Sequence, residues 1–134
     1  MPEKVGVVGL GLMGSVLASK LIAAGYEVHG CDIDDARVEA LKAGGGIPAS
    51  TPSEAAKEAS FVVLSLLNSD IVKEVCFGQD GIVQSAREGL IVIDTTTARP
   101  EDSIETAEKL RELGVSFLDT SLSGSRDNIV ALAG

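Results

Sequence analysis

The chain has 134 residues, a length that predicts one domain. Hydrophobic residues make up 45% of it and aromatic residues only 3%, with no Trp, so we expect an aliphatic core. The formal net charge of −9 disfavours binding to nucleic acid or to an anionic membrane surface. Two cysteines and one histidine give no basis for a disulfide framework or a metal site. The sequence has neither a long apolar run nor the pattern of a signal peptide, so we expect a cytoplasmic protein.

Short β-branched runs alternate with longer helical stretches along the chain. The predicted strands cover residues 4–8, 27–32, 61–66, 90–94 and 115–119. The predicted helices cover residues 13–24, 35–43, 52–59, 70–76 and 100–113. This order predicts an α/β fold: a doubly wound, Rossmann-like parallel sheet with helices on both faces, forming a single three-layer domain over residues 1–134.

A glycine-rich turn, GLGLMG at residues 9–14, follows the first predicted strand and opens the first predicted helix. In this pattern Gly9 permits a tight turn, Gly11 lets a diphosphate approach the backbone, and Gly14 lets the helix pack against the strand. The N–H groups at the helix start then face the phosphates. Asp32 ends the second predicted strand, where a carboxylate can accept hydrogen bonds from the adenosine ribose. The alternative is a tight turn in an unrelated α/β domain, with Asp32 merely solvated.

Several motifs, in order along the chain, resemble those of a known family. They lie at residues 7–14, 23–28, 66–69, 94–100 and 119–125. On these motifs the chain resembles the β-hydroxyacid dehydrogenases, which include 3-hydroxyisobutyrate dehydrogenase, tartronate semialdehyde reductase and, more distantly, 6-phosphogluconate dehydrogenase. Leu67 and Ser121 stand where the family has proline, and Ser125 stands where it has glycine. These departures leave the identity of the hydroxyacid open.

The resemblance implies a parent enzyme that transfers a hydride between a nicotinamide cofactor and a small 3-hydroxyacid such as 3-hydroxyisobutyrate. It also implies substrate contacts at Ser123, Gly124 and Ser125. In the family, a lysine on a later helix handles the proton at the substrate oxygen, so we expect no catalytic residue before Gly134. An all-helical C-terminal domain closes the site and forms the homo-oligomer in these relatives. The sequence therefore predicts a truncated chain that holds the cofactor domain of a longer enzyme.

The predicted cofactor site combines the glycine-rich turn with three later loops. Thr96 and Thr97 follow the predicted strand that ends at Asp94, at the sheet edge where such folds bind ligands. In the alternative interpretation, these hydroxyls bond the backbone of their own turn. The full predicted set is Gly9, Leu10, Gly11, Leu12, Met13, Gly14, Asp32, Leu66, Leu67, Thr96 and Thr97.

The residues around Asp32 favour NAD over NADP. Its carboxylate would bond the ribose 2′-OH and would repel a 2′-phosphate. Ile33, Asp34 and Asp35 follow, where NADP-using members of the family place an arginine. Arg37, on the next predicted helix, is the nearest cation in the sequence. Like-charge repulsion of a few kcal/mol predicts a preference for NAD on the order of 10²-fold.

Two other functions stay open from the sequence alone. One is a non-catalytic dinucleotide-binding sensor or subunit, and the other is a flavodoxin-like domain without a nucleotide. The lone His29 is interpreted as a packed or edge residue, and Cys31 and Cys76 as small buried residues. The apolar residues Ile129, Val130 and Leu132 predict that the C-terminal run is either disordered or buried in weak self-association.

Overall fold

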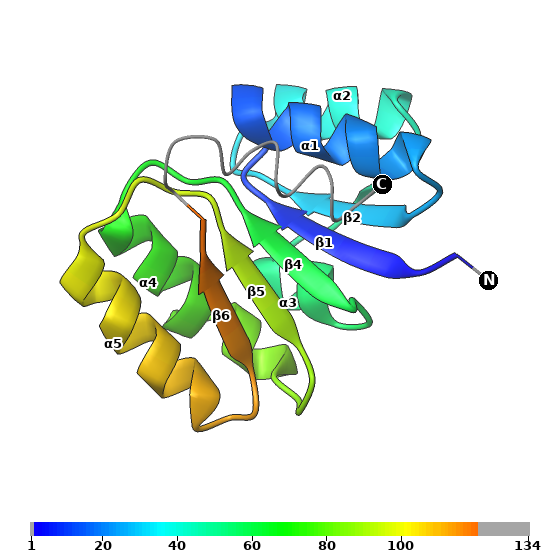
Figure 1. Cartoon of the computed structure of the whole chain (residues 1–134). Coiled ribbons are helices and arrows are strands. Elements are labelled where there is room, and N and C mark those ends of the chain that lie inside the picture. Colours follow the sequence, from blue (N-terminus) through cyan, green and yellow to red (C-terminus); the bar gives the residue numbers. More distant parts are fainter. Residues whose placement is uncertain (1, 121–134) are drawn as a thin grey trace.

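A six-stranded sheet with the strand order β3-β2-β1-β4-β5-β6 forms the centre of the protein (Figure 1). This computed structural model describes residues 2–120. All five strand pairings are parallel. The strands are β1 (Lys4–Val8), β2 (Glu27–Cys31), β3 (Ile47–Pro48), β4 (Phe61–Leu64), β5 (Ile91–Asp94) and β6 (Ser116–Asp119). The strand order reverses between β1 and β4, and ligands of doubly wound sheets bind at the carboxyl edge beside this point.

The helices cover the two faces of the sheet in separate groups (Figure 1). One face carries α1 (Leu12–Ala23) and α2 (Asp35–Ala43). The other carries α3 (Pro52–Ala56), α4 (Ser69–Phe77), the 3-10 helix η1 (Ile82–Ser85) and α5 (Pro100–Arg111). Successive residues of β4 alternate between the faces, so Val63 packs with α1 while Val62 and Leu64 pack with the second group. The predicted doubly wound, three-layer fold is confirmed.

Two short elements differ from the sequence prediction. The sequence does not predict β3 or η1, because two exposed residues and a single 3-10 turn carry no hydrophobic periodicity.

The predicted helix over residues 52–59 ends at Ala56. There the guanidinium of Arg87 donates hydrogen bonds to the carbonyls of Ala56 and Ala59. A side chain distant in sequence therefore supplies donors for carbonyls at and just beyond the end of this helix. Within residues 2–120, none of the helices is both long and apolar enough to cross a bilayer.

Asp102 joins the first turn of α5 to α4 through two cations. Lys73 Nζ lies 2.7 Å from Asp102 Oδ1, and Arg99 Nε donates to Asp102 Oδ2. Arg99 also reaches Asp70 Oδ1 at 3.0 Å. The hydrogen bonds from Lys73 and Arg99 lower the pKa of the Asp102 carboxyl from 3.8 to about 2. The ionised carboxylate is therefore the form that the folded protein stabilises.

This pKa predicts an acid-dependent contribution of Asp102 to stability. Because the folded pKa is depressed, the contribution is present above pH 3.8 and is lost as the pH falls toward about 2. We expect Asp102→Asn to lower the thermal midpoint at pH 7, with a difference from wild type that shrinks between pH 4 and pH 2. Thermal unfolding followed by circular dichroism across this range measures it.

The matched control for this prediction is Glu101→Gln, an equal charge change at the neighbouring position of α5. Glu101 is exposed and forms no ion pair with any residue in the described range. The control should change the thermal midpoint less than Asp102→Asn does at pH 7. A difference between Asp102→Asn and wild type that is the same at pH 7 and pH 2 would contradict the assignment.

Candidate functional site

The three glycines of the turn after β1 each meet a different steric requirement. Gly9 has a φ of +96°, and a Cβ there would lie 2.0 Å from the carbonyl oxygen of Ser65. A Cβ on Gly14 would lie 1.8 Å from the carbonyl oxygen of Gly9, so only glycine lets α1 approach the turn. Gly11 is open, because the nearest atom to its Cβ position is Arg37 Nη1 at 3.7 Å. The steric requirements for glycine at positions 9 and 14 are thus confirmed, and the role of Gly11 beside a diphosphate stays a prediction.

The first turn of α1 presents backbone N–H groups at the carboxyl edge of the sheet. The first N–H groups of any helix lack partners within that helix. Gly11 is the N-cap and supplies no side-chain acceptor, and the first turn contains no acidic residue. The positive end of the helix dipole is therefore not neutralised by the helix itself. Such a helix start is suited to a phosphate group.

The Asp32 carboxylate is held at the end of β2 by two backbone donors. Leu10 N–H donates to Oδ2 at 2.6 Å, and Asp34 N–H donates to Oδ1 at 2.8 Å. Only 6% of the Asp32 side chain is exposed. Each oxygen keeps a second lone pair, so the fixed carboxylate can still accept hydrogen bonds from a sugar.

Arg37 lies beside Asp32, which the sequence pattern alone did not place there. Its Nη1 is 3.8 Å from Asp32 Oδ2, and its Nε is 3.7 Å from Asp34 Oδ2. About half of the Arg37 side chain is exposed. The first turn of α2 carries this cation back over Gly11, so one positive charge is shared between two carboxylates.

Several hydrogen bonds join the chain after β4 to the chain after β5. Leu66 N–H donates to Thr96 Oγ1 at 3.0 Å, and Thr95 Oγ1 donates to the Leu64 carbonyl at 2.7 Å. Arg99 N–H donates to Ser69 Oγ at 2.9 Å. The strand predicted over residues 61–66 ends at Leu64, before the residue whose N–H is bonded to Thr96.

Asp94 anchors this pair of loops from inside the protein. It is fully buried, and its Oδ1 accepts the Thr96 N–H at 2.9 Å. Its Oδ2 has no hydrogen-bond partner among residues 2–120. Burial raises the pKa of the Asp94 carboxyl. Thr96 is only 2% exposed and Thr97 is exposed, so the two predicted cofactor residues point in different directions.

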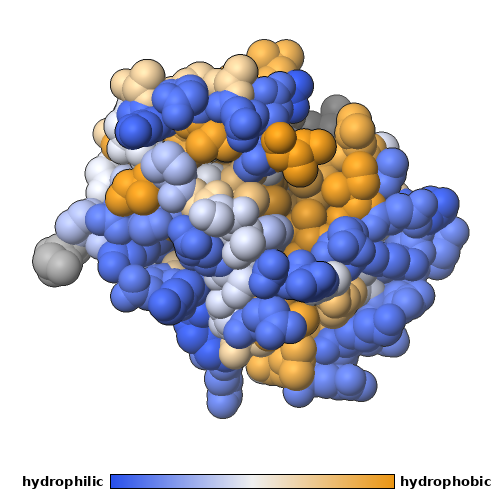
Figure 2. Space-filling view, turned by 180° about the vertical axis from the view of Figure 1, so that it is seen from behind, coloured by the Kyte–Doolittle hydropathy of each residue, from blue (hydrophilic) through white to orange (hydrophobic). Residues whose placement is uncertain are grey.

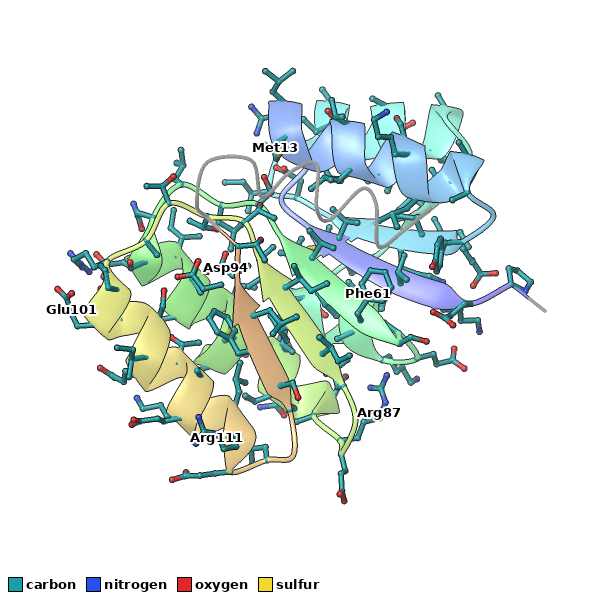
Figure 3. All side chains as sticks on the ribbon, viewed as in Figure 1. Met13, Phe61, Arg87, Asp94, Glu101 and Arg111 are labelled. Carbon is teal, nitrogen blue, oxygen red and sulfur yellow. The ribbon has the colours of Figure 1, made fainter. Side chains whose placement is uncertain are left out.

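A cleft of about 690 Å³ opens between the glycine-rich turn, the end of β2 and the start of α4. Of the predicted set, the residues that line it are Gly9, Gly11, Leu12, Asp32, Leu66 and Leu67. Figure 2 shows hydrophobic surface gathered in a hollow between α1 and α2, at the top, and α4, on the right. The predicted residues that do not line it are Leu10, Met13, Gly14, Thr96 and Thr97. Met13, at the start of α1, and Asp94, at the end of β5, both lie toward this edge of the sheet (Figure 3).

Several residues of the cleft wall were missed by the sequence analysis. Ile33 lies on one side, while Ile71 and Val75 lie on the other. The last two are spaced by four on α4, so they occupy one face of that helix. That spacing was the available signal, although a helical stripe of this kind is more often simply core. Polar residues also line the cleft, among them Ser50, Thr51, Ser65, Gln79 and Asp80.

Comparison with known proteins gives the family. The model of the NAD binding domain of 6-phosphogluconate dehydrogenase matches residues 4–132. The chain belongs to this family. Among curated relatives, 3-sulfolactaldehyde reductase of Escherichia coli (strain K12) is 32% identical over 123 residues, which are 92% of this chain and 41% of that protein. Mitochondrial 3-hydroxyisobutyrate dehydrogenase of Mus musculus is 33% identical over 120 residues, which are 90% of this chain and 36% of that protein. The chain therefore spans about two-fifths of the length of these relatives.

Several solved structures share the fold. A Mycobacterium tuberculosis 3-hydroxyisobutyrate dehydrogenase with L-serine superposes with a TM-score of 0.84 at 27% identity, covering 98% of this chain and 44% of that one. A variant imine reductase from Myxococcus stipitatus in complex with NAD+ gives a TM-score of 0.80 at 27% identity, covering 89% of this chain and 40% of that one. The imine reductase of the same organism in complex with NADP+ gives 0.79 at 27% identity, with coverage of 87% and 39%. Relatives at this distance therefore include complexes with either cofactor.

The described residues fit a dinucleotide. The helix start, the Asp32 carboxylate and the apolar walls of the cleft suit a diphosphate, a ribose and a base, respectively. Within the described part of the chain, His, Cys, Asp and Glu side chains form no group of three that could hold a metal ion. The predicted substrate residues Ser123, Gly124 and Ser125 lie outside the described residues, as does the C-terminal apolar run.

The glycine geometry predicts unequal losses of stability when Gly14 and Gly11 are each replaced by alanine. Gly14→Ala forces a Cβ onto the Gly9 carbonyl oxygen, so we expect it to destabilise the fold by about 2–3 kcal/mol. Gly11→Ala adds the same methyl group at an open position, and should cost less than about 1 kcal/mol. Urea unfolding measures both variants. Equal stability of the two would show that the close approach at Gly14 is not a real constraint.

Proposed function

We propose that the full-length protein is a nicotinamide-dependent oxidoreductase that acts on a small 3-hydroxyacid, and that this chain holds its cofactor. The observation that carries the proposal is the cleft that brings the open start of α1 beside the fixed Asp32 carboxylate. Relatives named as hydroxyacid dehydrogenases and aldehyde reductases support the reaction class.

Each part of the cleft has a distinct role in this proposal. Gly11 and the N–H groups that follow it would bind the diphosphate, and Asp32 would accept hydrogen bonds from the adenosine ribose. Ile33 and Ile71 would flank the base. Leu66, with the loop that Thr96 holds in place, would lie toward the nicotinamide end. When bound, the nicotinamide supplies the hydride chemistry, and the protein supplies position and electrostatics.

The proton step is assigned to residues outside this chain. The last lysine of the sequence is Lys109, on α5, which does not line the cleft. Ser123, Gly124 and Ser125 are proposed to contact the substrate, and a homo-oligomer is proposed for the full-length enzyme.

We expect the 134 residues alone to show no turnover with 3-hydroxyisobutyrate and NAD. A general acid or base typically contributes about 10²–10⁴-fold to the rate, and the relatives are much longer than this chain. Absorbance of the reduced nicotinamide measures turnover, on a preparation that calorimetry has shown to bind NAD. Substrate-dependent formation of reduced cofactor by this polypeptide would contradict the expectation.

We further propose that the cofactor is NAD in preference to NADP. Asp32 and Asp34 together carry two negative charges at the position expected for the ribose 2′-oxygen, while Arg37 supplies one positive charge. The remaining charge is negative and repels a 2′-phosphate. Asp32 alone predicts that NAD binds more tightly than NADP by on the order of 10²-fold. Because Arg37 offsets part of the repulsion, we expect a smaller preference for NAD, of at least about tenfold.

Calorimetric titration with both cofactors tests this preference. Asp32→Asn removes the charge, keeps an acceptor for one of the two backbone N–H donors, and should reduce the preference for NAD, whereas Arg37→Ala should increase it. Lys42→Ala is the matched control, since it removes an equal charge from the other end of α2 and does not line the cleft. Equal or tighter binding of NADP to the wild type would overturn the proposed preference without affecting the proposed dinucleotide site.

A further inference from the structure

The cleft continues past Asp32 toward a polar end formed by the turn after α4. Ile71 and Val75 lie one turn apart on α4, and Gln79, beyond the end of that helix, lines the cleft with them. α4 ends at Phe77, so Gln79 and its neighbour Asp80 lie just beyond the helix. The apolar wall that would flank a base therefore leads directly to a carboxamide and a carboxylate.

The turn at Asp80 has an unusual and fixed backbone. Asp80 is the one residue other than glycine with a positive φ in the described chain, at 58°. Its carbonyl oxygen accepts the Ser53 N–H at 3.0 Å, which ties the turn to α3. Aspartate is among the few residues that tolerate the left-handed region. The turn is therefore held by its backbone, and the side chain is not needed to form it.

The side chains of Gln79 and Asp80 are exposed and not engaged elsewhere. Neither forms a hydrogen bond or an ion pair with any residue between 2 and 120. Arg37 is the only cationic residue among those that line the cleft, and it lies with Asp32 and Asp34. This end of the cleft thus offers hydrogen-bond acceptors and one amide donor, and it disfavours an anionic group.

We propose that the Gln79–Asp80 turn recognises the amino edge of the cofactor's adenine base. This inference rests on the proposed dinucleotide binding. Adenine presents an amino group that donates and a ring nitrogen, N1, that accepts. A carboxylate only accepts, while a carboxamide both accepts and donates, so the two side chains complement that edge. Hypoxanthine reverses the pattern, since it has a carbonyl oxygen at position 6 and an N–H at position 1. Its carbonyl would face the Asp80 carboxylate with no proton between them.

The test compares the affinities of NAD and nicotinamide hypoxanthine dinucleotide, which differ only at this edge of the base. Calorimetric titration of the 134-residue chain should show NAD binding about tenfold tighter, the ratio that corresponds to about 1.4 kcal/mol for a lost hydrogen bond and an unpaired polar group. In Asp80→Asn, the amide can turn to donate to the hypoxanthine carbonyl. That variant should bind NAD nearly as well as wild type, with a preference reduced to about threefold or less.

A second variant keeps the inference testable if asparagine alters the turn. Asp80→Gly removes the side chain and suits a φ of 58°, so the fold should be unaffected and the preference should again fall. Glu74→Gln is the matched control, because it neutralises an exposed carboxylate on α4 that does not line the cleft. It should leave the preference unchanged.

The outcomes distinguish a failure of this inference from a failure of the proposed dinucleotide binding. Tight binding of NAD with equal affinity for the hypoxanthine analogue would overturn the role of the turn and leave the dinucleotide site standing. A full preference retained in both Asp80 variants would also overturn it. Binding of neither dinucleotide would overturn the proposed function, and this inference with it.

Discussion

The hydrogen bond from Leu10 N–H to the Asp32 carboxylate connects the two strand ends on which the rest of the site depends. It joins the residue two beyond β1 to the residue directly after β2, at 2.6 Å. Gly9 N–H donates to the Cys31 carbonyl just below it, at 2.9 Å. Together with the contact between Gly14 and the Gly9 carbonyl, these bonds hold the start of α1 and the acid in one arrangement. A site whose donors and acceptor are already in place loses little conformational entropy when a ligand binds.

The other half of the sheet edge is held by an independent set of polar contacts. Asp94 fixes the Thr96 backbone, and Thr96 in turn fixes the backbone of Leu66 across the neighbouring loop. These contacts pass through buried groups, which gives them more weight than equivalent contacts in water. These contacts therefore hold the loops after β4 and β5 together, and the two halves of the edge meet at the switch between β1 and β4.

The parts of this protein that could be predicted from sequence are those governed by local rules. The spacing of Gly9, Gly11 and Gly14 after a buried strand carries its own steric explanation, and the alternation of strands and helices specifies the sheet. Arg37 was named from the sequence, but its distance from Asp32 depends on how α2 packs, which no local pattern states. The same holds for Gln79 and Asp80, which reach the cleft only because α4 runs back along the sheet. Thr96 was predicted as a cofactor contact, which stays a prediction, and its hydroxyl also accepts the Leu66 N–H, a contact that depends on how two loops meet.

The net negative charge of the chain opposes the binding of a dinucleotide, so groups at the cleft have to offset that repulsion. A dinucleotide is an anion, and a protein with a formal charge of −9 repels it at long range. At physiological ionic strength, charges are screened beyond about 8 Å, so the more distant acidic side chains contribute little at the cleft. The glycine-rich turn is lined by the N–H groups of α1, whose first turn contains no acid, by the guanidinium of Arg37 over Gly11, and by the Asp32 carboxylate, whose charge Arg37 partly offsets. A small anion that touches only the glycine-rich turn is governed by this local field. A polyanion would extend beyond it over acidic surface, so the same fold can accept one and disfavour the other.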